Sequence, residues 1–554
     1  MNVDPITTEV IRNAYNSIAE DMSAVLNRSA YSPIIYEMHD YGVAIFNEDV
    51  QMLGQAPGLP YFTGGLEPAI KAVVQKYGLE NMKEGDVFVV NDSFMVGAHL
   101  NDTDIISVYC HEGKPVGFGV VRTHWSDIGM ADPGMPLGTT EIFQEGIRLP
   151  PTRLISEGEW EKDIVDILCL NSRLPQSLKG DMSAQIAAAR IGERRYLELI
   201  DRFGLDTVRQ ATINIFTTTE TKFRAFVSSI PDGTYSAEGY NDNDSISDDL
   251  VFVKVTVTVS GDEITIDTTG SNKQTRGNIN STIATTVTTA KLALAMLYPS
   301  ITPEVNHGSY TNLKVIAEPG SVFHAQEPAA CMRPIPTMLM LDLIFKALSP
   351  AIPDNVTAGL PGDSWNVHFF GRHPDTGEFY VQGESLDGGW GASSQVDGVS
   401  STTHSVAGDF RNCPTETMES RYPVLIRRLQ LGKDSGGAGK FRGGLNVVKE
   451  YELLEDAEVD LHFDRAKMPQ WGLFGGHDGV APRVTIYPAD NAEPMEVLKL
   501  KKTPMKKGTR IVARTGGGGG FGDPKERHTD AVREDLSNGY ISTNTARDIY
   551  GVEV

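Results

Sequence analysis

The sequence predicts an α+β protein of several domains, with mainly antiparallel sheets and helices segregated from them. Three observations lead to this prediction: a long amphipathic helix opens the chain, short apolar runs separated by turn residues follow it, and a strictly alternating stretch occupies the middle. Hairpin-like strands beside separate helices are typical of the α+β class. The 554 residues predict three to four domains if a domain averages about 150 residues.

The first predicted domain spans residues 1–230 and begins with a long helix. Over residues 4–31, apolar side chains recur at three- and four-residue steps, which gives a helix one apolar face. These side chains are Ile11, Ala14, Ile18, Met22 and Val25. Five apolar runs then predict the strands of one sheet: YGVAIFN, DVQMLGQ, GDVFVVND, DIISVYC and PVGFGVV. Further helices are expected at about 64–77, 161–203 and 207–227.

The second predicted domain spans residues 231–350. Its alternating run DLVFVKVTVTVSGDEITIDTTG predicts an antiparallel hairpin that turns at Ser260-Gly261-Asp262, and two helices are expected at 281–298 and 335–348.

The third predicted domain, 351–554, holds short strands and glycine-rich segments and closes in a helix through residues 530–549. Its runs 434–444 and 516–520 lack the spacing of a phosphate-binding P-loop, so we expect flexible loops or tight turns there.

Composition excludes several classes of partner. The net charge is -24, with 73 acidic against 49 basic residues, so the surface repels nucleic-acid backbones and anionic lipid. We see no apolar stretch of roughly 20 residues for a membrane span, and the first residues carry acids instead of a secretion signal. The four cysteines are far apart and form no CxxC pair, which indicates reduced thiols. We therefore expect a cytoplasmic protein without nucleic-acid or membrane partners.

The chemistry is expected in two neighbouring runs, VNDSFMVGAHLNDTD and VVRTHWSDIG. His99 and Asp102 are three positions apart, and His124 and Asp127 repeat that spacing beside an apolar, strand-like run. Asp40 precedes another such run. Two histidines with two or three carboxylates form a mixed nitrogen and oxygen set that suits Zn, Mn or Fe more than Ca or Mg. The competing interpretation is that these residues cap turns and bind only backbone.

Several longer motifs resemble those of the hydantoinase B and oxoprolinase family. Asn91-Asp92 followed by GAHLND, and the run RTHWSDIG, are similar to two family motifs that carry histidine and aspartate. Further similarities are TEIFQEGIRLPP, DSGGAGKFRGG, WGLFGG and TGGGGGFGDP. They extend from the N-terminal region almost to the last residues, so the resemblance covers essentially the whole chain. The sequence departs from the family pattern at Ala98, Asn101 and Thr123.

This resemblance implies the B-type subunit of a heteromeric, ATP-dependent enzyme that opens a cyclic amide. The expected partner is a hydantoinase A-type subunit that binds ATP-Mg and phosphorylates the oxygen of a hydantoin, lactam or oxoproline-like ring. A divalent transition metal in the present chain, Zn foremost with Mn and Fe as alternatives, would then activate water. The implied metal ligands are Asp40, His99, Asp102 and His124.

The resemblance also extends to residues beyond the metal ligands. Asp127 falls in the same motif as His124 and could be a metal ligand, a base or a residue that orients a ligand. Asp127 or Asp104 is expected to accept the proton of the water, and Glu141, Glu145 and Arg148 are expected to line the site or the subunit interface. Two alternatives stay open: a subunit of an ATP-dependent ketone carboxylase of the acetone or acetophenone type, and a non-enzymatic partner of the A-type subunit. The intact histidines and Asp102 argue against the second alternative.

Overall fold

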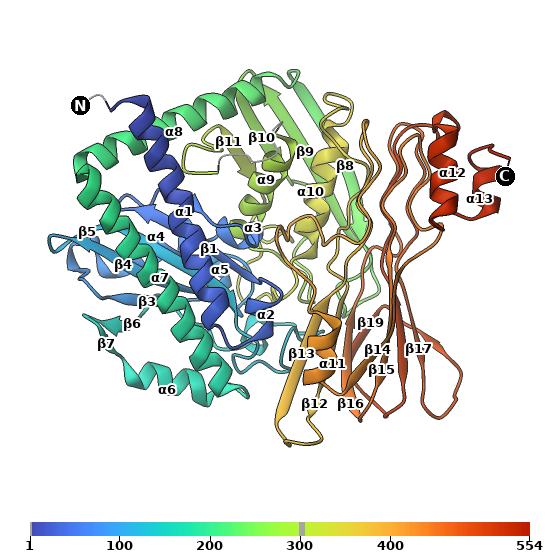
Figure 1. The fold of residues 1–554 in the computed structure, drawn as a ribbon, viewed down its shortest axis with the longest axis horizontal. Coiled ribbons are helices and arrows are strands. Elements are labelled where there is room, and N and C mark those ends of the chain that lie inside the picture. The colour runs from blue at the N-terminus through green and yellow to red at the C-terminus, as the bar shows by residue number, and fades with distance from the viewer. Residues whose placement is uncertain (1–2, 299–304, 554) are drawn as a thin grey trace.

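The N-terminal part of the chain is built on one seven-stranded sheet, drawn in blue and teal in Figure 1. The computed structural model describes residues 3–298 and 305–553. The strands are β1 (Tyr41–Asn47), β2 (Met52–Gln55), β3 (Val87–Val90), β4 (Asp102–His111), β5 (Lys114–His124), β6 (Thr152–Ser156) and β7 (Glu159–Trp160). They lie in the order β2-β1-β5-β4-β3-β6-β7, and every neighbouring pair is antiparallel. The five apolar runs predicted as strands are confirmed as β1 to β5.

Helices cover both faces of this sheet, which explains why its central strands are apolar on both sides. Val43 and Ile45 share a core with α1 (Pro5–Ser29) and α7 (Pro175–Phe203), whereas Ala44 and Phe46 share one with α4 (Leu66–Tyr77). The other elements of this part are α2 (Pro33–Tyr36), α3 (Pro60–Thr63), η1 (Leu79–Asn81), α5 (Ser93–Val96), η2 (Ile142–Gln144), α6 (Lys162–Leu170) and α8 (Leu205–Ser228).

A second sheet of four strands follows in the order β11-β10-β9-β8. Its strands are β8 (Gly233–Asn241), β9 (Val251–Ser260), β10 (Glu263–Asp267) and β11 (Leu313–Ile316). Alternate residues of β9 are buried in one core with α9 (Ile283–Leu297) and α10 (Ile335–Leu348). The predicted hairpin is confirmed, since Ser260 pairs with Glu263 and Gly261 has a φ of +62°. Only β10 and β11 pair in parallel among these strands.

Two antiparallel sheets pack face to face in the C-terminal part, in orange and red in Figure 1. One contains β12 (Asn366–Arg372), β13 (Phe379–Ser385), β16 (Ala457–His462) and β19 (Lys499–Met505). The other contains β14 (Val424–Leu431), β15 (Val447–Leu453), β17 (Arg483–Tyr487), β18 (Met495–Glu496) and β20 (Arg510–Arg514). Helix α11 (Thr415–Arg421) lies beside them. Phe369 and Leu461 from the first sheet share one core with Tyr451 and Ile511 from the second.

The chain ends in two short helices instead of the single helix predicted over residues 530–549. After η3 (Pro524–Glu526), helix α12 (Thr529–Ser537) stops where Gly539 adopts a φ of +74°, and α13 (Thr543–Asp548) follows. A glycine in the left-handed region ends helices readily because it has no Cβ to clash. The α+β class and the mainly antiparallel sheets are otherwise confirmed. Among the described residues, none of the helices has the length and apolar character that a membrane crossing needs.

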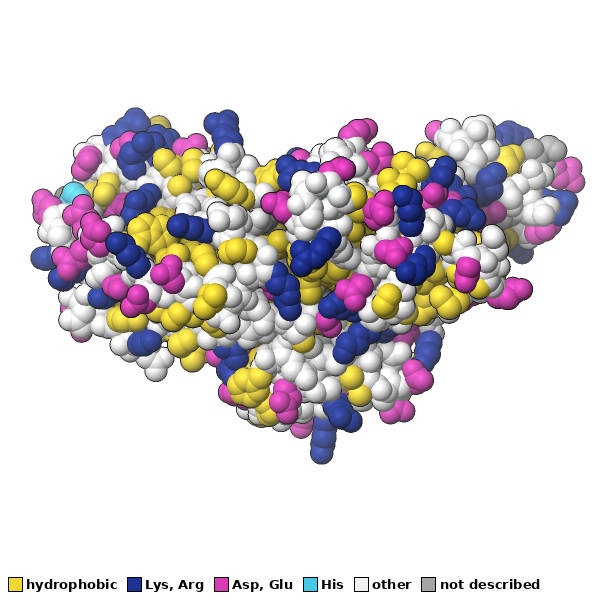
Figure 2. All heavy atoms as spheres, turned by 90° about the horizontal axis from the view of Figure 1, so that it is seen from below, with side chains coloured by type: hydrophobic (Ala, Val, Ile, Leu, Met, Phe, Trp, Pro, Cys, Tyr) yellow, Lys and Arg dark blue, Asp and Glu magenta, His cyan; other side chains and the backbone are white. Residues whose placement is uncertain are grey.

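The surface carries charges of both signs. Figure 2 shows acidic and basic side chains interspersed over one face, with hydrophobic side chains between them. The acidic excess behind the overall charge of -24 is spread along the sequence and is not a single acidic tail.

The glycine-rich run 516–520 is buried and hydrogen-bonded, so the predicted flexible loop or tight turn is wrong. The Gly518 N–H donates to the Gly444 carbonyl at 3.0 Å, and the Gly518 carbonyl accepts from Gly437 at 2.8 Å. A Cβ on Gly518 would lie 1.8 Å from the Trp390 carbonyl oxygen. Glycine is therefore needed for the close approach of backbones, which composition alone does not reveal.

We expect Gly518→Ala to lower the free energy of unfolding by about 3 kcal/mol or more, because the added methyl group meets backbone that cannot rotate away. Gly233→Ala is the matched control, since its Cβ would meet only the end of the Tyr235 side chain at 3.0 Å. Urea denaturation measures both. Equal losses for the two variants would contradict this explanation of the glycine run.

Candidate metal centre

Three neighbouring strand ends meet at one edge of the N-terminal sheet. Asp102 begins β4, His124 ends β5, and the two residues face each other across the antiparallel ladder. Asp40 directly precedes β1 on the other side of β5, and its carbonyl accepts from the His124 N–H at 3.2 Å. Side chains directly opposite each other on antiparallel strands lie roughly 5 Å apart at Cβ. Strand register thus places a histidine between two carboxylates.

His99 joins this group through a tight turn after α5. Gly97 and Ala98 have φ angles of +79° and +63°, and the His99 carbonyl accepts from the Asp102 N–H at 3.0 Å. The Ala98 N–H donates to the Thr285 hydroxyl at 2.8 Å, close to the start of α9. The helix that packs on the second sheet therefore helps to fix the turn that carries His99.

The side chains form a compact donor cluster. Donor atoms of His99, Asp102 and His124 all lie within 4.8 Å of one another. Asp102 places one carboxylate oxygen 3.4 Å from His99 Nδ1 and the other 3.4 Å from His124 Nδ1. The two rings are nearly perpendicular, with centroids 5.0 Å apart. Asp40 follows at 3.9 Å from His124 Nδ1. All four sequence-predicted ligands are therefore neighbours.

Electrostatics and unsatisfied atoms suit this cluster to a cation. Burial lowers the pKa of His99 to about 4, so its ring is neutral at pH 7, as metal ligation requires. For His124, burial lowers the pKa but Asp102 and Asp40 outweigh it and raise the pKa above its usual value, so a metal would have to displace a proton there. Burial opposes ionisation of Asp102, but the nearby histidines hold the pKa of its carboxyl below the usual value. His99 Nδ1 and Asp102 Oδ1 are buried without a hydrogen-bond partner. A divalent transition metal would satisfy both atoms, and the two-nitrogen, carboxylate donor set is one that Zn, Mn and Fe accept.

The cluster lies on the wall of a cavity of about 140 Å³. Residues from each third of the chain line it, with Leu59, Tyr61, Phe62 and Ile335 among the apolar ones. The polar lining outside the donor cluster includes Arg333, His368, Gln382, Glu384 and His404. These polar residues were not predicted from the sequence. Their only sequence signal was a polar side chain within an apolar stretch, as in NVHFF and CMRPIP.

Asp104 forms a buried ion pair instead of facing the cavity. Its carboxylate accepts from Arg122 Nε at 2.9 Å and Nη2 at 2.6 Å, and both side chains are fully buried. Arg122 also donates to the carbonyls of Gly65 and Val96, each at 3.3 Å. The pair thus joins the start of α4 and the end of α5 to the strands that carry the donor cluster.

Asp127 is likewise engaged by an arginine. Its carboxylate accepts from the backbone N–H of Gly129 at 3.1 Å and from Arg173 Nη1 at 2.9 Å. Arg173 lies just before α7, so this contact fixes the loop after β5 against the helical layer. The two HxxD pairs noted in the sequence therefore differ: His99, Asp102 and His124 converge, whereas Asp127 points to a separate partner.

The three remaining sequence candidates lie outside the cavity lining among the described residues. Glu141 is exposed and caps η2. Arg148 pairs with Asp92 at 2.7 Å and with Glu327 at 2.6 Å.

Glu145 is fully buried and accepts from the Thr139 hydroxyl at 2.7 Å and from the Cys331 N–H at 2.9 Å. Burial raises the pKa of Glu145 to about 8. Glu145 therefore holds the segment that leads into Arg333, which does line the cavity.

The family model described as Hydantoinase B/oxoprolinase matches residues 4–524. The putative B-type chain of a D-/L-hydantoinase from Pseudomonas sp. (strain NS671) is 30% identical over 100% of this chain and 95% of its own length. The crystal structure of ATP-dependent caprolactamase from Pseudomonas jessenii has a TM-score of 0.93 and 30% identity, covering 100% of this chain and 97% of that chain.

A nucleotide-free structure of acetone carboxylase shares the fold. Its TM-score is 0.91 at 18% identity, and the match covers 99% of this chain and 80% of that chain. At this identity the likeness concerns the fold alone.

We expect Asp104→Asn to lower the free energy of unfolding by about 3–5 kcal/mol, because it leaves the Arg122 charge buried and unpaired. Asp21→Asn is the control, since Asp21 pairs with Arg195 at the surface and exposed pairs contribute at most about 1 kcal/mol. Chemical denaturation of both variants measures the difference. A small and equal loss of unfolding free energy in the two variants would show that the buried pair does not stabilise the sheet.

Proposed function

This chain belongs to the hydantoinase B/oxoprolinase family, and from that membership we propose that it is the B-type subunit of an ATP-dependent amidohydrolase that opens a cyclic amide. The observation that carries the proposal is the cluster of His99, Asp102 and His124 on the wall of a small, partly apolar cavity. The names of the hydantoinase and caprolactamase relatives support a hydantoin or lactam ring as the substrate class.

We propose that Asp40, His99, Asp102 and His124 hold a divalent transition metal, with Zn foremost and Mn or Fe as alternatives. The unsatisfied buried atoms of His99 and Asp102 support this choice. When bound, such an ion supplies Lewis-acid chemistry that brings the pKa of a water toward about 7. The protein's own contribution is the rigid placement of the donors at strand ends, where backbone hydrogen bonds leave them little freedom.

Asp104 and Asp127 receive positioning roles in this proposal. Both carboxylates are occupied by arginines, Asp104 by Arg122 and Asp127 by Arg173. They hold the strand ends and the loop after β5 in place. Glu145 accepts from the backbone N–H groups of Cys331 and Met332 and so positions the segment that brings Met332 and Arg333 to the cavity lining.

The chemistry balances if the partner subunit activates the ring. An A-type subunit that binds ATP-Mg would transfer the terminal phosphoryl group to the amide oxygen, releasing ADP. One water then adds to the activated carbon, the C–N bond breaks, and the two protons given up by the water end on the ring nitrogen. A second water converts the resulting acyl phosphate to a carboxylate and phosphate.

A ketone carboxylase subunit is the second candidate, favoured by the fold shared with acetone carboxylase. In that case an enolate and a bicarbonate-derived carboxyl group would meet in the cavity, and the product would depend on bicarbonate. The fold is common to both candidates, so the substrate decides between them.

We expect His99→Ala and His124→Ala each to lower the bound transition metal to well below one ion per chain, because each removes one of the donors. His111→Ala, at the opposite end of β4 from Asp102, is the matched control and is expected to keep the wild-type metal content. Elemental analysis of the purified proteins measures this. Wild-type stoichiometry in both cluster variants would overturn the ligand assignment.

We expect the chain, reconstituted with an A-type partner, to hydrolyse ATP in the presence of a cyclic amide and to open that ring without bicarbonate. Coupled measurement of ADP release and of the ring-opened product checks this, with the His99→Ala complex as the inactive control. Product formation from a ketone only, and only with bicarbonate, would replace the hydrolase proposal with the carboxylase.

A further inference from the structure

Three buried nitrogen-bearing side chains on the cavity wall have atoms without a hydrogen-bond partner. They are Arg333, His368 and His404, which are 2%, 4% and 9% exposed. The atoms concerned are Arg333 Nη1 and the Nδ1 atoms of the two histidines. Nearly all buried polar atoms in proteins are hydrogen-bonded, so unsatisfied ones in residues that line a cavity can take a water or a ligand as partner there. None of these residues belongs to the donor cluster for the metal.

Arg333 is held rigidly from one side. Its Nη2 donates to Asp363 Oδ1 at 2.7 Å, and the Asp363 carboxylate also accepts from the backbone N–H of Ser364 at 2.8 Å and of Asp464 at 2.7 Å. Asp363 is fully buried. Because three donors fix this carboxylate, the guanidinium has one preferred orientation, and that orientation leaves Nη1 without a hydrogen-bond partner in a residue that lines the cavity.

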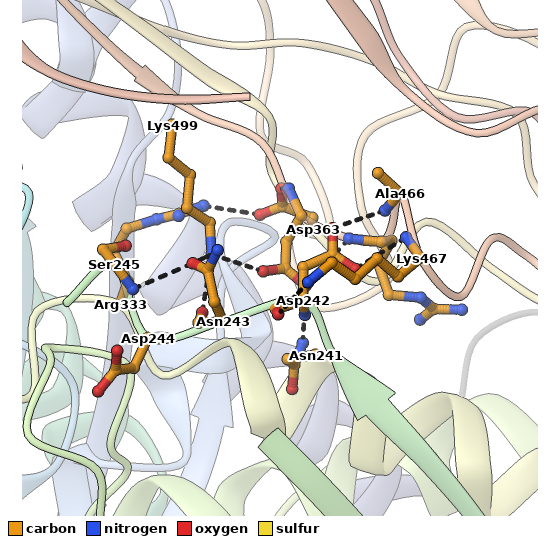
Figure 3. Close-up of polar contacts among 12 residues, drawn as sticks. Asn241, Asp242, Asn243, Asp244, Ser245, Arg333, Asp363, Ala466, Lys467 and Lys499 are labelled. Carbon is orange, nitrogen blue, oxygen red and sulfur yellow. Dashed lines mark hydrogen bonds and ion pairs between the residues drawn. The ribbon is translucent and has the colours of Figure 1, made fainter. Parts of the chain in front are cut away.

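A wider network keeps Asp363 in place, and Figure 3 shows it as sticks joined by dashed lines. Asp464 accepts from Lys499 Nζ at 2.8 Å and from the Asp242 N–H at 3.1 Å. Asp242 in turn accepts from the backbone N–H groups of Ala466 and Lys467 at 2.8 Å and 2.9 Å. Loops from the second sheet and from the C-terminal sheets are thereby tied together behind Arg333. Such an arrangement pre-organises one charged group toward the cavity.

The two histidines add donors without adding charge. Burial, together with His462, lowers the pKa of His368 to about 3, and burial, together with Arg333, lowers the pKa of His404 to about 4. Both rings are therefore neutral at pH 7, and each offers one N–H. The nearby Glu384 is already paired with Lys449 and with the Tyr451 hydroxyl, so its charge is compensated. The wall thus presents several N–H donors, and the charge of Arg333 is balanced by Asp363.

This combination fits an oxyanion with several acceptor oxygens. Arg333 keeps its Nη2 on Asp363, so its free Nη1 can donate one charge-assisted hydrogen bond to an anion, and such bonds are among the strongest in proteins. The same cavity holds the donor cluster for the metal, so an anion on this wall would share the space with the reacting carbon.

We propose that Arg333, with His368 and His404, binds the phosphoryl group that the activated substrate carries into this cavity. The inference rests on the proposed function, in which the ring arrives O-phosphorylated. A carboxylate attached to the ring presents the same oxyanion chemistry and is the other source that the experiment must separate.

The first test titrates inorganic phosphate into the purified full chain after its metal has been removed by chelation, with isothermal titration calorimetry as the readout. We expect saturable binding of phosphate by the wild-type chain. Its affinity is expected to weaken at least 10-fold in Arg333→Met and about 3-fold or more in His404→Leu. The His404→Leu variant keeps the contact between Arg333 and Asp363. Arg465→Met is the matched control, because it also leaves a buried aspartate, Asp342, without its arginine but lies outside the cavity lining. The control should bind phosphate like wild type.

Unchanged phosphate affinity in both Arg333→Met and His404→Leu, or no phosphate binding by the wild-type chain, would overturn the inference. An equal weakening by Arg465→Met would do the same, since it would reveal a general loss of structure.

The second test separates the two sources of oxyanion. In the reconstituted complex, Arg333→Lys is expected to slow the opening of a ring without a carboxylate as strongly as that of a ring with one. A loss confined to the carboxylate-bearing ring would overturn the phosphoryl assignment. Wild-type turnover measured in parallel tests the proposed function itself: if no ring is opened, that proposal fails, whereas the phosphate titration still decides whether the wall binds the anion.

Discussion

A buried ion pair between Asp104 and Arg122 supports the arrangement on which the candidate metal centre depends. The two residues face each other on β4 and β5. They are two residues along the strands from the pair of Asp102 and His124, on the same face of the sheet. Two charges without solvent must remain paired, because separating them leaves an uncompensated charge in a medium of low dielectric constant. Arg122 also donates to the carbonyls of Gly65 and Val96, at the start of α4 and the end of α5. The same side chain therefore holds these helix ends in place relative to the paired strands.

The local structure was largely predictable from the sequence, because period and turn signals are local. The helix over residues 4–31 and the hairpin at Gly261 are examples. The exceptions depended on contacts that no local pattern encodes. The run 516–520 is rich in glycine because several other segments approach its backbone, and the closing helix divides where Gly539 turns the chain.

The candidate site likewise contains some residues that the sequence pattern predicted and others that only the fold brings together. The pattern located His99, Asp102 and His124, but their convergence depends on the pairing of β4 with β5, and the different direction of Asp127 depends on Arg173. Arg333, His368 and His404 come from parts of the chain that are far from the cluster in the sequence. Single polar residues in apolar stretches carry too little local information to be recognised as part of a site before the fold brings them together.

The cavity lining therefore combines two chemically distinct sets of side chains, a donor cluster from the N-terminal sheet and nitrogen-bearing side chains from later parts of the chain. The central claim is that the donor cluster holds a transition metal. Anomalous diffraction from crystals of the protein, recorded above and below the absorption edge of the metal found by elemental analysis, tests it most directly. We expect one anomalous peak at roughly 2.0–2.2 Å from donor atoms of His99, Asp102 and His124. A peak held by other residues, or no peak at this cluster in metal-loaded crystals, would contradict the claim.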